Sequence, residues 1–160
     1  MLRWLSESRV EYVLVGAVAT ALRSDTSANG PVAIVPAPYG RNLDRLSRAL
    51  TSAHARMRID VGSADPEEPD TMPVKMNAEK LLRGPRWPLQ CGVHKIDIEG
   101  RAPGLPRYQE LLYEAHTIEI DPGLKVNVAS PEDIEHYVHR RAAPPTEIRI
   151  TRTTRTTNAS

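Results

Sequence analysis

Two carboxylates separated by one residue, Asp97 and Glu99, offer the clearest opportunity for chemistry in this sequence. They belong to the run Val93–Glu99, where Ile96 and Ile98 alternate with charged residues, a pattern typical of a β-strand with one polar side. Residues two apart on a strand project from the same face, so both carboxylates could approach one ligand. Such a pair can hold Mg²⁺ when substrate phosphates supply the other oxygen ligands.

Neighbouring charges leave other interpretations of this pair open. Lys95 is on the same strand face and could neutralise Asp97 without a metal ion, and a polar face at a sheet edge needs no function. Asp25, in the polar loop 24–30, could contribute a further carboxylate, although nothing in its spacing requires this.

Two kinds of side chain that often do chemistry are better explained here by structural roles. His94 falls on the apolar side of its strand, which predicts a hydrogen-bonded core histidine. His136 and His139 are three residues apart, a spacing similar to that of metal ligands, and could share a helix face with Glu132 and Glu135. Histidines in the second half of a helix also interact favourably with its dipole, which is the simpler explanation.

The elements expected to position these residues begin with a strand, a glycine and a helix. Glu11–Gly16 is a short, β-branched and apolar run that predicts a buried strand, and Ala17–Arg23 supplies good helix formers. Val32–Val35 predicts a second strand, bounded by Pro31 and Pro36, which cannot donate ladder hydrogen bonds. The chain therefore passes through strand, helix and strand within its first quarter.

The middle of the chain changes period. Apolar residues spaced three and four apart predict a helix that begins at Asn42 as the N-cap: Leu43, Leu46, Leu50, Ala53 and Met57. Residues 60–73 are acidic and Pro-rich and predict a surface loop, followed by a short helix over Asn77–Arg83. The segment Arg83–Pro88 predicts a rigid turn whose Trp87 either plugs the core or brackets a base or a peptide.

The last third predicts a helix that starts at Pro106, a hairpin and a final helix. Strands over 117–120 and 125–129 surround the turn sequence Asp121-Pro122-Gly123, and Ser130-Pro131 begins a helix that runs to about Arg141. These elements predict an α/β (α+β) fold with a mixed sheet flanked by helices. We expect one domain over 1–143 and an Arg/Thr-rich tail or edge strand over 144–160.

Composition restricts the partners and the compartment. The 160 residues carry a net charge of +1, which argues against dominant electrostatic capture of nucleic acid, although from His139 onward five arginines and one acid give 5 − 1 = +4. Cys91 is the single cysteine, so it forms no internal disulfide, and it has no His-plus-acid arrangement suggesting a nucleophile. The start lacks a signal-peptide pattern and no run is long enough to span a membrane, so we expect a cytoplasmic protein.

The order of these motifs resembles a known superfamily. The run Tyr12–Ala19, the strand ending Ile34-Val35-Pro36, Ile96-Asp97-Ile98 and the segment Val128–Ile134 occur as they do in small bacterial nucleotidyltransferases of the polymerase-beta-like superfamily. The branch that includes AbiE-type toxin nucleotidyltransferases is especially similar. The resemblance covers about Leu5 to Arg141.

The resemblance implies roles for individual positions. Gly16 and Ala17 occupy the positions where the family has a Gly-Gly or Gly-Ser that lets the backbone approach the triphosphate of the nucleotide. Asp97 occupies the position of the family's third metal-binding carboxylate. An Asp-x-Asp on the second strand would hold two Mg²⁺ ions, but this chain has Pro31-Val32-Ala33, which offers no side-chain oxygen. The usual Lys and Arg-x-Lys-Asp segment after Ile134 is missing as well.

These departures lead to three hypotheses. The first is a nucleotidyltransferase-fold protein with impaired catalysis that binds a nucleotide, RNA or protein partner. The second is an active, divergent enzyme that uses Asp97 with Glu99 or Asp25 to hold Mg²⁺ and moves an NMP from an NTP to RNA or protein. The third is a regulatory partner in a toxin–antitoxin-like assembly. The oligomeric state is left open.

Overall fold

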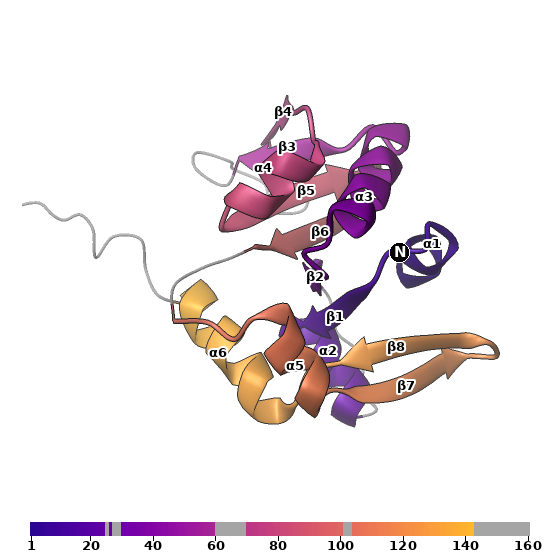
Figure 1. The fold of residues 1–160 in the computed structure, drawn as a ribbon, viewed down its shortest axis with the longest axis vertical. Helices are drawn as coiled ribbons and strands as arrows, with labels where there is room; N and C mark the ends of the chain where they lie inside the picture. The colour runs from indigo at the N-terminus through magenta and orange to yellow at the C-terminus, as the bar shows by residue number, and fades with distance from the viewer. Residues whose placement is uncertain (25, 27–29, 60–69, 101–103, 143–160) are drawn as a thin grey trace, which may run out of the picture.

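A single mixed sheet organises this chain in the computed structural model, which describes residues 1–24, 26, 30–59, 70–100 and 104–142 (Figure 1). Its eight strands are β1 (Tyr12–Val15), β2 (Val32–Pro36), β3 (Arg56–Ile59), β4 (Asp70–Pro73), β5 (Arg86–Cys91), β6 (His94–Glu99), β7 (His116–Asp121) and β8 (Leu124–Val128). They are ordered β4-β3-β5-β6-β2-β1-β8-β7 across the sheet.

Six helices within the described ranges cover this sheet: α1 (Leu2–Glu7), α2 (Gly16–Ser24), α3 (Gly40–Ser52), α4 (Ala78–Arg83), α5 (Tyr108–Glu114) and α6 (Pro131–Ala142). Figure 1 shows α3 and α4 beside β3, β5 and β6, and α2, α5 and α6 beside β1 and β8. The predicted class, a mixed sheet flanked by helices, is confirmed. None of the helices in the described ranges is long and apolar enough to cross a membrane.

Three strands at the centre determine which side chains can meet. β1 pairs antiparallel with β2, and β2 pairs parallel with β6. The register places Val15 opposite Ala33, and Ala33 opposite Asp97, so these three side chains share one face of the sheet. The position where the resemblance expects a metal-binding carboxylate therefore lies directly beside Asp97.

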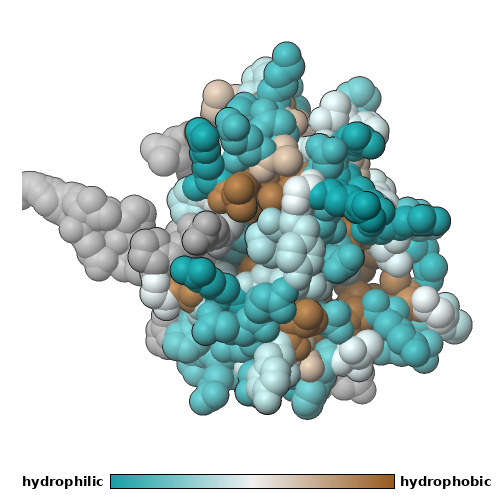
Figure 2. Space-filling model, in the orientation of Figure 1, coloured by the Kyte–Doolittle hydropathy of each residue, from teal (hydrophilic) through white to brown (hydrophobic). Residues whose placement is uncertain are grey.

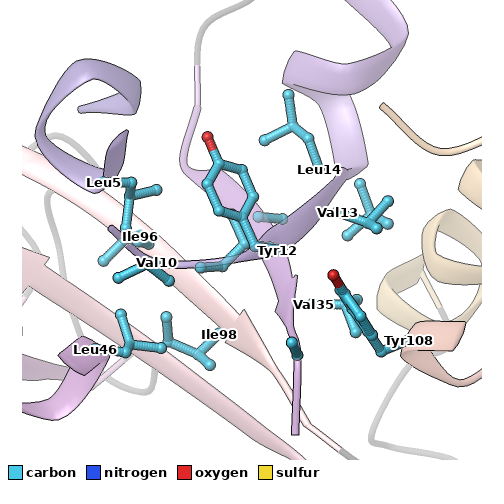
Figure 3. Packing of buried hydrophobic residues seen from close by; sticks show 14 of the residues in the cluster. Leu5, Val10, Tyr12, Val13, Leu14, Val35, Leu46, Ile96, Ile98 and Tyr108 are labelled. Carbon is cyan, nitrogen blue, oxygen red and sulfur yellow. The ribbon is translucent and has the colours of Figure 1, made fainter. Parts of the chain in front are cut away.

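The core fills both sides of these central strands. On one side Leu46 of α3 and Leu5 of α1 pack with Ile96 and Ile98 (Figure 3). On the other side, Tyr108 of α5 lies beside Val13 and Val35, both of which are buried (Figure 3). Burial of these aliphatic side chains, which stabilises by roughly 25 cal/mol for each Å² of apolar surface, holds the sheet and helices together.

The helix expected from Asn42 begins earlier and ends sooner than its apolar spacing suggested. α3 starts at Gly40, and the side chain of Asn42 is buried, where it accepts a hydrogen bond from the Glu11 amide rather than capping the helix. Met57 lies in β3, because the chain turns at His54, whose φ of 55° is left-handed. The spacing of apolar residues that is typical of a helix therefore continued by chance past the end of α3 as far as Met57 in β3.

Three strands were missed by sequence reasoning: β3, where the helix was expected to continue, and also β4 and β5. β5 occupies the segment expected to be a rigid turn around Trp87, and β4 lies at the end of the expected acidic loop. Pro88 within β5 concealed the strand, since proline is unusual inside a sheet. The remaining expected helices and the hairpin are present, although α5 starts at Tyr108 rather than at Pro106. Asn77 caps α4 by accepting a hydrogen bond of 2.8 Å from the Lys80 amide. The expected tail over 144–160 lies outside the described residues.

Candidate functional site

Asp97 is a buried carboxylate held by two arginines. Its side chain is 0% exposed, and its Oδ2 atom accepts a hydrogen bond of 3.2 Å from Nη2 of Arg86. Arg58 donates through its own Nη2 to the other oxygen, Oδ1. Buried charges require such partners, because removing a carboxylate from water costs several kcal/mol unless nearby charge and hydrogen bonds offset that cost.

Glu99 belongs to the same group of charges. Its side chain is 1% exposed, and its Oε2 lies 3.6 Å from Nε of Arg86. The two acids and two arginines balance, 2 − 2 = 0, so the group needs no further charge to be neutral. We call Arg58, Arg86, Asp97 and Glu99 the arginine–carboxylate cluster. The sequence-based expectation of a polar strand at a sheet edge was wrong, because β6 lies inside the sheet and both acids are buried.

Strand register explains why these four side chains meet. Arg86 of β5 is opposite Glu99 of β6, and Pro88 is opposite Asp97, so their side chains lie on one face. Arg58 reaches the cluster from β3, which pairs with the other edge of β5. Sequence reasoning found both acids and neither arginine. The spacing Arg56-Met57-Arg58 was the available signal, since it alternates charged and apolar residues as a half-polar strand does.

Gly16 and Ala17 begin α2 directly after β1. Gly16 is buried and has a φ of 80°, which glycine adopts without strain, and Ala17 is exposed at the amino end of the helix. From Val15 to Asp97 is two strand spacings, or about 10 Å. Val15, Ala33 and Asp97 are each 0% exposed, so the sheet face between Gly16 and the arginine–carboxylate cluster is closed.

The cluster does not fit Mg²⁺. This ion takes oxygen ligands in octahedral geometry, whereas both oxygens of Asp97 already accept guanidinium groups, and Ala33 supplies no oxygen. Across the part of the chain that the structure describes, no group of three or more His, Cys, Asp or Glu side chains is arranged to hold a metal ion.

The other candidate residues have different environments. His94 is exposed at the start of β6, so the expectation of a core histidine was wrong. Lys95 is half-buried on β6, and His136 is exposed on α6. Burial raises the pKa of the Cys91 thiol, which disfavours the reactive thiolate. Asp25 and the side chain of His139 lie outside the described residues.

Comparisons with known proteins give a likeness of fold and no match to a family. No protein-family model matches this chain, and no curated protein does. Among solved structures, the chain is similar to the crystal structure of ANT(2″)-Ia in complex with adenylyl-2″-tobramycin, with a TM-score of 0.49 and 13% identity. The match covers 91% of this chain and 75% of that one. A likeness of this size transfers no chemistry from one protein to the other.

Proposed function

We propose that this chain is a nucleotidyltransferase-fold protein that has lost two-metal catalysis and acts by binding a nucleotide. One observation carries the proposal: Asp97, the residue in the place of the third metal ligand, lies beside Ala33 and is held by Arg58 and Arg86. Two guanidinium groups, rather than metal ions, hold the Asp97 carboxylate.

The exchange of metal for arginine has a clear chemical consequence. A guanidinium stays protonated at all physiological pH values and has five N–H donors, so a guanidinium that already pairs with a carboxylate can still donate hydrogen bonds to phosphate oxygens. It cannot coordinate an attacking hydroxyl and lower its pKa, which is a contribution that a metal ion makes to phosphoryl transfer. The proposal therefore keeps the binding of a phosphate by hydrogen bonds and omits the transfer step that needs a metal ion.

Two features favour a phosphate as the group bound. The side chain of Arg86 is 33% exposed, so its planar fork can contact phosphate oxygens from the rim of the cluster. The amino end of α2, at Gly16 and Ala17, presents backbone N–H groups toward which an anion is attracted. Because the sheet face between these two features is closed, the phosphates would lie across its rim rather than enter between the strands.

A calorimetric titration tests this function. We expect each of the four NTPs to bind the full chain in EDTA as well as in Mg²⁺, with affinity that falls as salt rises. Arg86→Lys keeps the charge that Asp97 needs but removes the fork, and we expect binding to weaken by about five- to tenfold. Arg48→Lys, at an exposed position on α3, is the matched control and should leave binding unchanged.

A transfer assay addresses the rival hypothesis of an active enzyme. Each labelled NTP is incubated with the chain, Mg²⁺ or Mn²⁺ and total RNA, and label on RNA or on protein is measured. Transfer that Asp97→Asn abolishes would overturn the proposal. Binding of RNA or of a protein, with no NTP bound, would also overturn it and would favour a macromolecular partner such as that of a toxin–antitoxin-like pair.

A further inference from the structure

A pocket of about 680 Å³ lies at the carboxyl ends of β2 and β6, where it meets the arginine–carboxylate cluster at Glu99. α3 and α4 form one side of it and the start of α5 forms the other. The described residues that line it are Val35, Pro36, Pro38, Leu43, Leu81, Leu82, Glu99, Gly100, Leu105, Pro106, Arg107 and Tyr108. Its size lies within the range of pockets that bind small organic molecules.

The walls of this pocket are held in place before any ligand binds. Three of its residues are prolines, whose backbone φ is fixed by the ring. Pro106 is anchored by Tyr137, whose hydroxyl donates a hydrogen bond of 3.0 Å to its carbonyl oxygen. Gly100 donates to the Pro85 carbonyl at 2.9 Å, and a Cβ there would come within 1.9 Å of the Gly84 oxygen. A preformed site loses less entropy on binding than a mobile one.

The lining of the pocket favours an apolar ligand body. Leu43, Leu81 and Tyr108 form buried parts of its wall, while Leu82 is 41% exposed at its rim. Figure 2 shows apolar surface at α4, above α5 in the same view. An aliphatic or aromatic group of suitable size would exchange water for leucine, valine and proline side chains, which is favourable for apolar surface.

The charges at the pocket favour an anion. Glu99 carries one of the two charges among the described lining residues, but it is 1% exposed and is paired with Arg86. Arg107 carries the other and is exposed, one residue before α5. Among these residues, therefore, the charge that a ligand can reach is positive.

We propose that this pocket binds an organic acid, with its apolar body among the leucines and prolines and its carboxylate against the Arg107 guanidinium. The pocket shares the buried Glu99 with the arginine–carboxylate cluster, but its described lining includes none of Gly16, Ala17, Arg86 and Asp97, to which the nucleotide proposal assigns roles. The inference goes beyond the proposed function, and each can fail without the other.

Octanoate, octanol and octylamine share an apolar chain and differ in head-group charge, so they separate the two parts of the proposal. The full chain is titrated with each by calorimetry, at concentrations where each probe is monomeric. We expect octanoate to bind about three- to tenfold more tightly than octanol, since a charge-assisted hydrogen bond at a partly exposed site contributes about that factor. Octylamine should bind most weakly.

Two variants locate the binding. Arg107→Gln should remove the advantage of octanoate and leave the affinity for octanol unchanged, whereas the control Arg48→Gln should alter neither. Leu82→Glu places an acid at the rim, on a residue exposed enough to tolerate it, and should weaken octanoate by more than tenfold. Thermal unfolding of each variant checks that the fold is intact.

Several outcomes would overturn the proposal. Absence of octanoate binding at millimolar concentration would do so, as would equal affinities for the three probes in the unaltered chain. Octanoate binding that is lost in Arg86→Lys but kept in Leu82→Glu would assign the anion to the arginine–carboxylate cluster instead. If the chain bound octanoate as expected but bound none of the four NTPs, only the proposed nucleotide site would be contradicted.

Discussion

Ala33 of β2 and Asp97 of β6 occupy paired positions on two parallel strands, with both side chains on the same face and both fully buried. In a two-metal site of the kind that the sequence resembles, this pairing would bring two carboxylates together around metal ions. Here a methyl group stands beside a carboxylate that two arginines neutralise. The relationship between these two residues is therefore the most direct place to test the proposed loss of catalysis.

Restoring a carboxylate at position 33 should make stability depend on Mg²⁺. Ala33→Asp places a second acid beside Asp97 in a buried position, and we expect the free energy of unfolding to fall by about 3 kcal/mol in EDTA. Mg²⁺ bridging the two carboxylates should recover part of that loss. Urea denaturation with and without Mg²⁺ measures both effects. Ala33→Asn is the control, since it adds similar volume without charge and should show no Mg²⁺ dependence.

The double variant Pro31→Asp with Ala33→Asp completes the missing Asp-x-Asp motif. We expect it to increase the Mg²⁺-dependent part of nucleotide binding in the calorimetric titration, because it returns oxygen ligands to both positions. If the affinity in Mg²⁺ stays equal to the affinity in EDTA for this variant, then β2 is not the strand that the resemblance implies.

The arginine–carboxylate cluster should be a strong determinant of stability. Arg58→Met removes one of the two guanidiniums that hold Asp97, and a buried carboxylate that has lost a charged partner costs about 3 kcal/mol. Arg58→Met combined with Asp97→Asn should cost clearly less than the sum of the two single substitutions, since the remaining groups are closer to neutral. A double-mutant cycle in urea measures the coupling. Strict additivity would show that the Arg58–Asp97 contact contributes little.

The sequence was sufficient to predict the fold class and to single out Asp97 and Glu99 as a pair on one strand, for physical reasons. Local patterns identified β1 and β6, because period-two alternation and short apolar runs are properties of consecutive residues. The partners of Asp97 come from Arg58 and Arg86, which are 39 and 11 residues away, and this pairing depends on sheet order. Sheet order is set by long-range packing that one sequence does not display.

The same limit explains the error at Asn42. An Asn before a period of apolar residues predicts an N-cap, and this prediction is sound locally. In the structure the Asn42 side chain instead contacts the backbone of Glu11, 31 residues earlier. Its Oδ1 accepts from the Glu11 N–H and its Nδ2 donates to the Glu11 carbonyl. Tertiary hydrogen bonding overrode the local preference, as it often does for buried polar side chains.

Alkaline pH should weaken the fold through Tyr12. Burial raises the pKa of this phenol to about 12 from an unfolded value of 10.0, so the folded state binds its proton more tightly. The stabilisation is fully present below pH 10 and is lost as the pH rises toward 12, by up to about 2 kcal/mol. Urea midpoints of the unaltered chain and of Tyr12→Phe, measured from pH 9 upward, isolate this contribution. A stability difference between the two chains that does not change with pH would contradict the prediction.

Asn42 should be more important to stability than its place on a helix suggests. Its Oδ1 accepts from the Glu11 amide at 2.7 Å, and its Nδ2 donates to the carbonyl oxygens of Glu11 and Ala37 at 2.9 Å each. Asn42→Ala would remove the partners of the Glu11 N–H and the Ala37 carbonyl, whereas the Glu11 carbonyl still accepts at 3.0 Å from the Ala37 amide, so we expect a loss of about 2–3 kcal/mol in the free energy of unfolding. Asn42→Asp keeps the acceptor and removes both donors, and it should also be destabilising. Asp44→Ala, at an exposed position on the same helix, is the matched control and should change stability by less than about 0.5 kcal/mol.

Because the three hydrogen bonds of Asn42 join α3 to the entry of β1 and the exit of β2, hydrogen exchange of the Glu11 amide should accelerate in Asn42→Ala and stay slow in the control. Equal exchange in the two variants would show that water replaces the side chain without cost.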